Sequence, residues 1–416
     1  MRSLLKFIWL PLFLSTSCTM DAIKNDFPES FTITVENVTP IERLDEAIAL
    51  EVAQMHGKAP DFNPQAFLLT SGDTEWASQA NDLDGDGHVD QIVAAVDFKP
   101  NEKKELLVRF AKTGIKPRPY LKRTQAELSI KTGGRFENRK YIGGKFQNVS
   151  FLRVPPQHTD HSEYIRYEGP GWESDKVGYR FYLDWRNAHD IFGKKTPAMV
   201  LQNIGQDGFD SYHNMCDWGM DVLKVGESLG IGSPGMWQND KAIRISQTDS
   251  VRCDIVLNGP VASLIRTQFF GWKISEKMDI LTEELLITAG SRLTRHSLLL
   301  DGDAENLCTG IVLLPDAELL QSTGDGLWSY LATFGKQSLA GDQLGMAILF
   351  RTRDLIKVAR DALNHVVILR PEKGQVAYYS LAAWEQEPGG IKDKESFIRY
   401  LQVTSQRLDH PLVIEY

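Results

Sequence analysis

"VGYRFYLDWRN", residues 177–187, alternates apolar and polar side chains with a period of two. Successive side chains of a β-strand point to opposite faces, so this period predicts a strand. One face carries four large apolar side chains that we expect in a core: Tyr179, Phe181, Leu183 and Trp185. The other face carries four polar side chains: Arg180, Tyr182, Asp184 and Arg186. Two guanidinium groups beside a phenol and a carboxylate suit recognition of an anionic group, and the alternative is a salt-bridge ladder on a sheet.

The same signature recurs along the chain. Runs rich in β-branched and aromatic residues occur at 31–39, 47–52, 91–98 and 105–111, and many more follow residue 240. Pro, Asn, Asp and Gly separate them at hairpin-length intervals. This succession predicts a mainly β protein whose large antiparallel sheets pack as a sandwich.

Two features divide the chain further. The basic, glycine-rich stretch 112–150 marks a domain boundary, so we expect a small N-terminal β domain at 23–115 and a large catalytic β-sandwich at 130–416. A C-terminal helix is predicted over 392–408 from apolar side chains at helical spacing. The stripe consists of Phe397, Tyr400, Leu401, Thr404 and Leu408.

Composition limits the function classes. The chain has 416 residues, of which 42% are hydrophobic and 24% charged, as in a globular protein with a large core. A net charge of −9 argues against nucleic acid as a partner, because nucleic-acid-binding proteins present a basic face. It does not exclude an anionic small molecule, since local Arg and Lys placement sets the field of a cleft.

The N-terminus has the features of a secretion signal. Residues 1–18, "MRSLLKFIWLPLFLSTSC", place Arg2 and Lys6 before an apolar stretch and end in small residues and Cys18. This arrangement resembles a bacterial lipoprotein signal, in which Cys18 would carry the lipid. We expect a periplasmic or outer-membrane protein whose contact with the membrane is the lipid anchor. The alternative is a plain signal peptide. The oligomeric state is not predicted.

The stretch "NDLDGDGHVDQ" (81–91) resembles a calcium-binding loop. Its carboxylates occupy positions 1, 3, 5 and 9 of an EF-hand-type loop: Asp82, Asp84, Asp86 and Asp90. Val93 stands at position 12 in place of the bidentate Glu, and a β-rich run follows. We therefore expect either a structural Ca²⁺ site or a metal-free acidic turn.

A second polar cluster lies at 210–221, "DSYHNMCDWGMD". It contains Tyr212, His213 and Asn214, and His is the side chain best suited to proton transfer near neutral pH. Three tryptophans are candidate platforms for sugar rings, with core packing as the alternative: Trp172, Trp218 and Trp237. The segment "QHTDH" offers His158, Asp160 and His161 at ligand-capable spacing, but its Pro-Pro leader favours an exposed loop.

Three long segments carry a resemblance: 82–98, 167–196 and 212–232. They are similar to a family of secreted or lipid-anchored bacterial proteins from polysaccharide-utilisation systems, formerly a domain of unknown function (DUF4861), which includes the ulvan oligosaccharide dehydratase. The closing segment 377–401 looks like the last strand and helix of galactose-mutarotase-like sandwiches. The family resemblance implies removal of water across C4–C5 of the non-reducing-end uronic acid of an acidic oligosaccharide, leaving a 4,5-unsaturated uronyl end.

That reaction needs particular groups. Negative charge develops on the substrate carboxylate when the C5 proton leaves, which suits Arg180 or Arg186. We expect Tyr182 and His213 to form the general acid and base. The remaining candidates are assigned to positioning or binding: Asp184, Glu173, Tyr212, Asn214, Trp172, Trp218 and Trp237. No cofactor is predicted for catalysis. The alternatives are a glycoside hydrolase, with Glu173 and Asp184 or Asp217 as paired carboxylates, and a non-catalytic glycan-binding lipoprotein.

Overall fold

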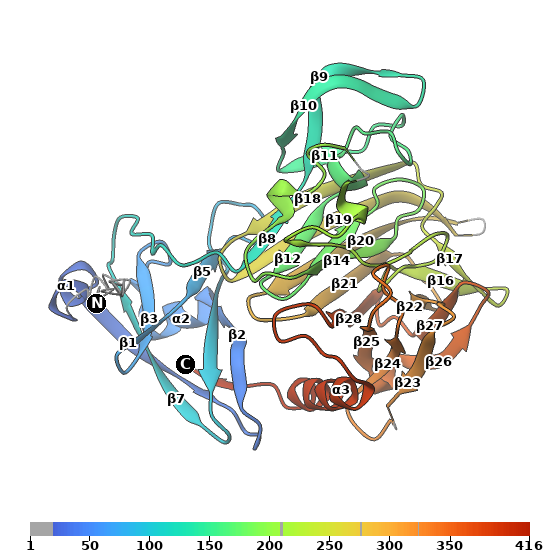
Figure 1. The fold of residues 1–416 in the computed structure, drawn as a ribbon. Helices are drawn as coiled ribbons and strands as arrows, with labels where there is room; N and C mark the ends of the chain where they lie inside the picture. Colours follow the sequence, from blue (N-terminus) through green and yellow to red (C-terminus); the bar gives the residue numbers. More distant parts are fainter. Residues whose placement is uncertain (1–19, 209–210, 275–276, 323) are drawn as a thin grey trace, which may run out of the picture.

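The computed structural model describes residues 20–208, 211–274, 277–322 and 324–416 (Figure 1). Cys18 and the segment 1–18 lie outside these residues. The described chain is mainly β, its sheets are antiparallel and a long helix stands near the C-terminus, so the predicted fold class is confirmed. Within the described residues, no helix has both the length and the apolar character needed to cross a membrane.

The strands between residues 29 and 110, together with β29 from the C-terminus, form two sheets. One sheet has the order β29-β1-β7-β3-β4 and the other β2-β6-β5. Their bounds, with those of two short helices, are α1 Met20–Asp26, β1 Glu29–Glu36, β2 Arg43–Glu51, α2 Val52–Lys58, β3 Phe67–Ser71, β4 Thr74–Trp76, β5 Ser78–Asn81, β6 Gln91–Phe98, β7 Lys103–Phe110 and β29 Val413–Glu415. The chain therefore returns at its end to this N-terminal unit, where β29 pairs with β1.

A nine-stranded sheet, here the central sheet, runs through the larger part of the molecule (Figure 1). Its order is β11-β18-β19-β20-β21-β28-β25-β24-β23. The bounds are β11 Phe151–Arg153, β18 Ser250–Asn258, β19 Ala262–Ile274, β20 Lys277–Thr288, β21 Leu293–Asp301, β23 Ala317–Gln321, β24 Trp328–Gly335, β25 Leu344–Arg351 and β28 Gln375–Trp384.

The helix α3, Lys394–Asp409, packs on this sheet. The Asp393 side chain caps it by accepting a hydrogen bond from the Ser396 amide. Phe397 and Leu401 are fully buried against strands β24 and β25, as the apolar stripe predicted. The helix thus covers one end of the sheet.

Two five-stranded sheets lie against the other face of the central sheet and share its largest apolar cluster. The first, here the β13 sheet, has the order β15-β14-β13-β12-β8, and the second, the β22 sheet, has the order β17-β16-β22-β27-β26. A β9–β10 hairpin projects above them (Figure 1). The bounds are β8 Thr124–Glu127, β9 Ser129–Glu137, β10 Lys140–Asn148, β12 Gly171–Ser174, β13 Gly178–Phe181, β14 His189–Lys194, β15 Gly219–Asp221, β16 Gly235–Gln238, β17 Lys241–Arg244, β22 Leu307–Val312, β26 Leu355–Arg360 and β27 Asn364–Leu369.

Candidate functional site

The strand that holds Arg180 is shorter than its alternation indicated. β13 ends at Phe181, and an irregular turn leads to β14. Tyr179, Phe181 and Leu183 are buried as predicted, whereas Trp185 is 43% exposed, so its assignment to the core is wrong. The Trp185 side chain leaves the core because the strand has ended four residues before it.

The polar face of β13 is also buried. After β14 the chain folds back over this face, and Val200, Leu201, Ile204 and Tyr212 form an apolar cluster with Tyr167 and with Phe192 of β14. Arg180 is 2% exposed beneath this cover. A buried guanidinium group must find partners within the protein, because losing its hydration without compensation is costly.

Arg180 is the centre of a hydrogen-bonded network. Its cross-strand partner Asp190 accepts from Nε and Nη2 at 2.9 and 2.7 Å, and Asp221 accepts from Nη2 at 2.6 Å. The hydroxyls of Tyr182 and Tyr212 accept from Nη2 and Nη1 at 2.7 and 2.9 Å. Tyr182 in turn donates to Asp190 at 2.5 Å. Arg180 is therefore committed to protein partners.

His213 joins this network from the second predicted segment. Its Nε2 lies 3.4 Å from Oδ2 of Asp221, the same oxygen that Arg180 contacts. Asp221 is 1% exposed, whereas the His213 side chain is 35% exposed. The network thus runs from a buried carboxyl to an imidazole at the surface.

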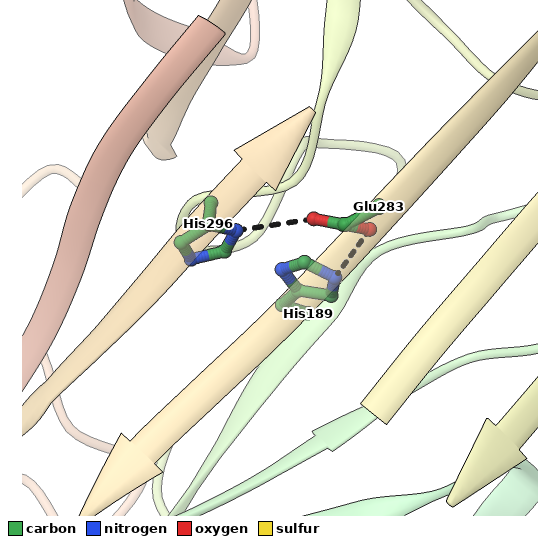
Figure 2. Close-up of side chains that lie close together, drawn as sticks. All are labelled: His189, Glu283 and His296. Carbon is green, nitrogen blue, oxygen red and sulfur yellow. Dashed lines mark hydrogen bonds and ion pairs between the residues drawn. The ribbon is translucent and has the colours of Figure 1, made fainter. Parts of the chain in front are cut away.

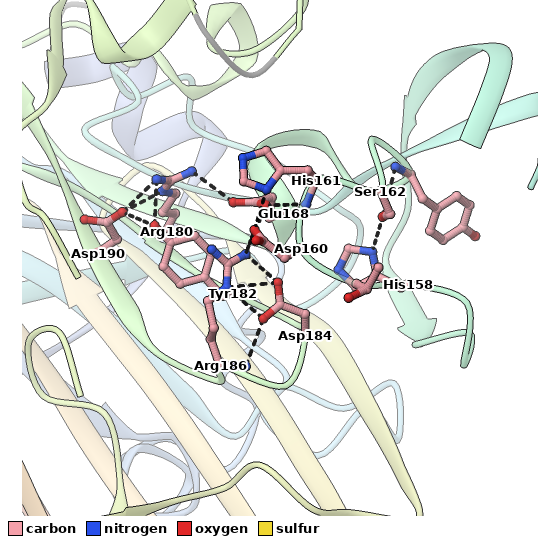
Figure 3. Close-up of polar contacts among 12 residues, drawn as sticks. His158, Asp160, His161, Ser162, Glu168, Arg180, Tyr182, Asp184, Arg186 and Asp190 are labelled. Carbon is pink, nitrogen blue, oxygen red and sulfur yellow. Dashed lines mark hydrogen bonds and ion pairs between the residues drawn. The ribbon is translucent and has the colours of Figure 1, made fainter. Parts of the chain in front are cut away.

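Arg186 forms the neighbouring half of the site (Figure 3). Its guanidinium pairs with Asp184, and it also contacts Glu168 at 2.9 Å and Asp160 at 3.0 Å. The same group lies 3.9 Å from the ring centroid of Tyr182. Tyr182 therefore stands between the two arginines, and all four predicted catalytic side chains belong to one connected cluster.

The protonation states follow from burial and charge. Burial alone would raise the pKa of Glu168, but Arg180 and Arg186 outweigh it and lower that pKa to about 2. Burial, followed by the neighbouring Asp190 charge, raises the pKa of Asp221 well above its usual range. Burial also raises the pKa of Tyr182. Glu168 is therefore anionic at neutral pH and Tyr182 keeps its proton, whereas the raised pKa of Asp221 favours the protonated form of that carboxyl.

A pocket of about 280 Å³ opens beside Glu168. Its polar lining includes Lys131, His161, Glu163 and Asp207, with Gly205 to Gly208 along one wall. Four of the lining residues have left-handed backbone φ values between 40° and 71°: His161, Glu163, Tyr167 and Glu168. Such conformations are strained in non-glycine residues and concentrate at functional sites.

Two predicted binding residues lie in the core instead. Trp172 is 1% exposed, stacks on Tyr179 and donates to Thr294, so it offers no platform to a sugar. The side chains of Glu173 and Lys194 are fully buried and form an ion pair at 2.5 Å. Both predictions of substrate contact are corrected by this burial, because the side chains face the interior.

Two more predicted binding residues, Tyr212 and Asp184, are buried as partners of Arg180 and Arg186, and the remaining three are at least partly exposed. Asn214 is exposed next to His213, and Trp218 is half-buried against Phe192. Trp237 lies on β16 in the β22 sheet, with Lys357 over its ring. Asn214 and Trp218 therefore border the Arg180 network, whereas Trp237 belongs to another sheet.

Sequence reasoning missed several members of the cluster. Glu168, Asp190 and Asp221 were within the quoted motifs but had no assigned role, because their partners come from other strands. "QHTDH" was expected to be an exposed loop, yet His158 is buried and hydrogen-bonds Ser162, and Asp160 contacts Arg186. The signal available in the sequence was an acidic residue close to the predicted strand that carries Arg180 and Arg186.

Three groups of His and carboxylate side chains in the described part of the chain bring ligand atoms within 4.8 Å of one another. They are Asp82–Asp84–Asp86, Asp160–His161–Glu168 and His189–Glu283–His296 (Figure 2). In the first group, each carboxylate accepts backbone hydrogen bonds within its own turn.

The acidic turn leads into a strand. Asp90 lies apart from the Asp82 group and accepts from the Leu83 amide at 2.6 Å. Val93, at the twelfth position, is buried on β6. The calcium site stays a prediction.

Comparison with known proteins completes the description. No curated protein sequence matches the chain. An alpha-mannosidase from Enterococcus faecalis V583 aligns with a TM-score of 0.46 and 10% identity, over 94% of this chain and 46% of that one. A glycosyl hydrolase family 38 protein from Enterococcus faecalis aligns with a TM-score of 0.46 and 9% identity, over 93% and 47%.

The chain spans about half the length of these two proteins, and at such scores the likeness does not bear on activity. The model of the family described as "Domain of unknown function (DUF4861)" matches residues 35–414, which include the Arg180 network and the acidic turn. The chain belongs to the DUF4861 family, as the three sequence segments indicated.

Proposed function

We propose that this protein is a carbohydrate-active dehydratase that removes water across C4–C5 of the non-reducing-end uronic acid of an acidic, ulvan-type oligosaccharide. The observation that supports it most is the meeting of two separate motifs. His213 comes from the 212–232 segment and Tyr182 from the 167–196 segment, and both contact the Arg180–Asp221 pair. An elimination needs an acid, a base and positive charge together, and the cluster supplies all three.

The base in this proposal is His213. The neighbouring Asp221 orients the imidazole, and the exposed side chain can reach a substrate above the network. The acid is Tyr182, whose raised pKa keeps its proton in place at neutral pH. In the substrate-free protein that hydroxyl donates its single proton to Asp190, so the proposal requires this hydrogen bond to be exchanged for one to the departing C4 hydroxyl when substrate binds.

In this proposal Arg186, and not Arg180, binds the carboxylate of the substrate. Arg180 is 2% exposed and its donors are occupied by protein groups. The side chain of Arg186 is 13% exposed, and its partner Asp160 is 33% exposed. A uronate that replaces Asp160 would pair with Nη2 of the guanidinium, whose Nε–Nη2 edge is held by Asp184. Lys131 supplies a second positive charge in the adjoining pocket.

The direct test is incubation with a panel of oligosaccharides that end in a uronic acid. Dehydration lowers the product mass by one water and produces absorbance near roughly 235 nm from the new conjugated double bond. We expect His213→Ala and Tyr182→Phe to reduce turnover by ~10²–10⁴-fold each, the range for acid–base groups, with unchanged circular dichroism. His410→Ala, an exposed histidine at the end of α3, is the matched control and should retain full activity. Full activity in both site variants would refute the assignment.

One observation favours the hydrolase alternative. The carboxylates of Glu163 and Glu168 both line the pocket, and a hydrolase uses two carboxylates about 5–10 Å apart. The pair expected from the sequence does not serve, because Glu173 is buried with Lys194 and Asp184 with Arg186. Hydrolysis would be established instead if the wild-type protein released reducing ends without absorbance near roughly 235 nm and the Glu168→Gln variant did not release them.

We also propose that Cys18 is lipidated and holds the enzyme at the periplasmic or outer-membrane surface, since the sequence around it resembles a lipoprotein signal. Labelling of expressing cells with a fatty-acid analogue should mark the wild-type protein and not Cys18→Ser. Equal labelling of both would refute lipidation at this residue.

A further inference from the structure

A second cluster of ionisable side chains lies inside the sandwich, behind the candidate active site. His189 stands at the start of β14 in the β13 sheet, whereas Glu283 and His296 lie on β20 and β21 of the central sheet (Figure 2). The three side chains are at most 1% exposed. The cluster therefore joins two layers of the fold and is closed to bulk water.

Its hydrogen bonding is incomplete. Nδ1 of His296 lies 3.0 Å from Oε1 of Glu283, and Nε2 of His296 lies 2.8 Å from the Ser380 hydroxyl. Nε2 of His189 faces Oε2 of Glu283 at 3.5 Å without hydrogen-bond geometry, and Nδ1 of His189 has no hydrogen-bond partner. Buried polar atoms are nearly always satisfied, so orphaned atoms at one point indicate a missing partner.

We infer that His189, Glu283 and His296 bind a divalent transition-metal ion of the zinc type. Two imidazoles and one carboxylate form a known zinc ligand set. Zinc–ligand distances of about 2.1 Å in a tetrahedron place neighbouring ligand atoms roughly 3.4 Å apart. The separations here are 3.5 Å between His189 Nε2 and Glu283 Oε2 and 3.0 Å between His296 Nδ1 and Glu283 Oε1.

The surroundings suit such a site. The Ser380 hydroxyl orients the His296 ring from the nitrogen opposite Glu283, as second-layer partners of metal-binding histidines do. Tyr378 stacks on the same ring at 4.5 Å, and Phe181 packs edge-on against His189 at 4.9 Å. A proton shared between Glu283 and His296 would account for one contact but would leave both nitrogens of His189 unsatisfied. A metal uses one of them.

The ion has a structural consequence. His189 is followed by Asp190, whose side chain points to the opposite face of β14 and holds Arg180. A metal that fixes His189 to the central sheet therefore also fixes the strand that carries Asp190. This inference concerns metal binding and stands independently of the reaction proposed above.

The test measures metal content in the full-length, tag-free protein by inductively coupled plasma mass spectrometry. We expect about one zinc per chain in the wild type, and loss of it in Glu283→Gln and His189→Gln. His365→Gln removes another buried histidine, on β27 outside the cluster, and should retain the ion. Zinc that survives in the Glu283 and His189 variants would overturn the site.

A second measurement needs no variant. Wild-type protein stripped with a chelator and titrated with zinc chloride should gain roughly 3–6 °C in Tm, because an ion that binds the folded state stabilises it. X-ray absorption at the zinc edge should show nitrogen and oxygen ligands with imidazole scattering. A metal-free preparation whose Tm does not respond to zinc would overturn the inference.

Discussion

Replacing Glu173 with Gln separates a structural role from a binding role at this position. Glu173 and Lys194 have fully buried side chains joined at 2.5 Å. Oε1 of Glu173 also accepts from the amides of Val200 and Leu201 at 2.7 and 2.9 Å. Gln keeps that acceptor and removes the charge, so Lys194 is left in the interior without a counter-charge. Breaking one side of a buried ion pair costs about 3–5 kcal/mol.

This cost should be visible in thermal unfolding followed by calorimetry. For a large domain about 1 kcal/mol shifts Tm by 2–4 °C, so Glu173→Gln should lower Tm by roughly 6–20 °C. The double variant Glu173→Gln with Lys194→Met should be more stable than Glu173→Gln alone, because the unpaired ammonium is gone. An unchanged Tm together with a raised KM for oligosaccharide would refute the structural role of Glu173 and support a role in substrate binding.

Three further predictions concern the charged clusters. Because the pKa of Glu168 is lowered, its ionised carboxylate stabilises the folded state fully above pH 4.5, and this stabilisation is lost as the pH falls toward 2. In urea unfolding, Glu168→Gln should therefore remove about 3 kcal/mol from the acid dependence of the free energy of unfolding. An unchanged dependence on pH would contradict the lowered pKa. Asp221→Asn should preserve the Tm, because an amide resembles the protonated carboxyl that the raised pKa of Asp221 favours. The same variant should lower turnover ~10²-fold and alter one limb of the pH–rate profile through His213, and an unchanged profile would exclude that link. Calcium should raise the Tm of the wild-type protein and leave the Tm of the double variant Asp82→Asn with Asp86→Asn unchanged. An equal rise in the Tm of both proteins would exclude this loop as the calcium site.

The sequence predicted which neighbouring side chains of the site share a face, but it did not predict the contacts between segments that are far apart in the chain. A period of two revealed which side chains share a face, and it correctly separated Tyr179 from Arg180. It could not reveal that both faces are buried, because the cover over Arg180 includes Val200, Leu201, Ile204 and Tyr212, whose positions depend on tertiary packing. The end of β13 at Phe181 likewise depends on its pairing with β14.

Partners across strands were beyond local reasoning for the same reason. Arg180 meets Asp190 through the β13–β14 register and Asp221 through the next strand, β15. Glu173 illustrates the opposite error, since we expected it to bind the substrate and its side chain is buried. Its partner Lys194 lies 21 positions on, and only the sheet order brings the two together.

The charge balance of the site bears on how it could move protons. Arg180 and Arg186 face five carboxyl groups: Asp160, Glu168, Asp184, Asp190 and Asp221. Two cations do not neutralise five anions in a buried space, so the least costly adjustment is for a carboxyl to keep its proton. Two of the five, Asp160 and Asp221, have a raised pKa, and Asp221 is the one in contact with His213. The excess of acid therefore favours a proton on Asp221, beside the His213 imidazole, where the elimination proposed above would draw on it.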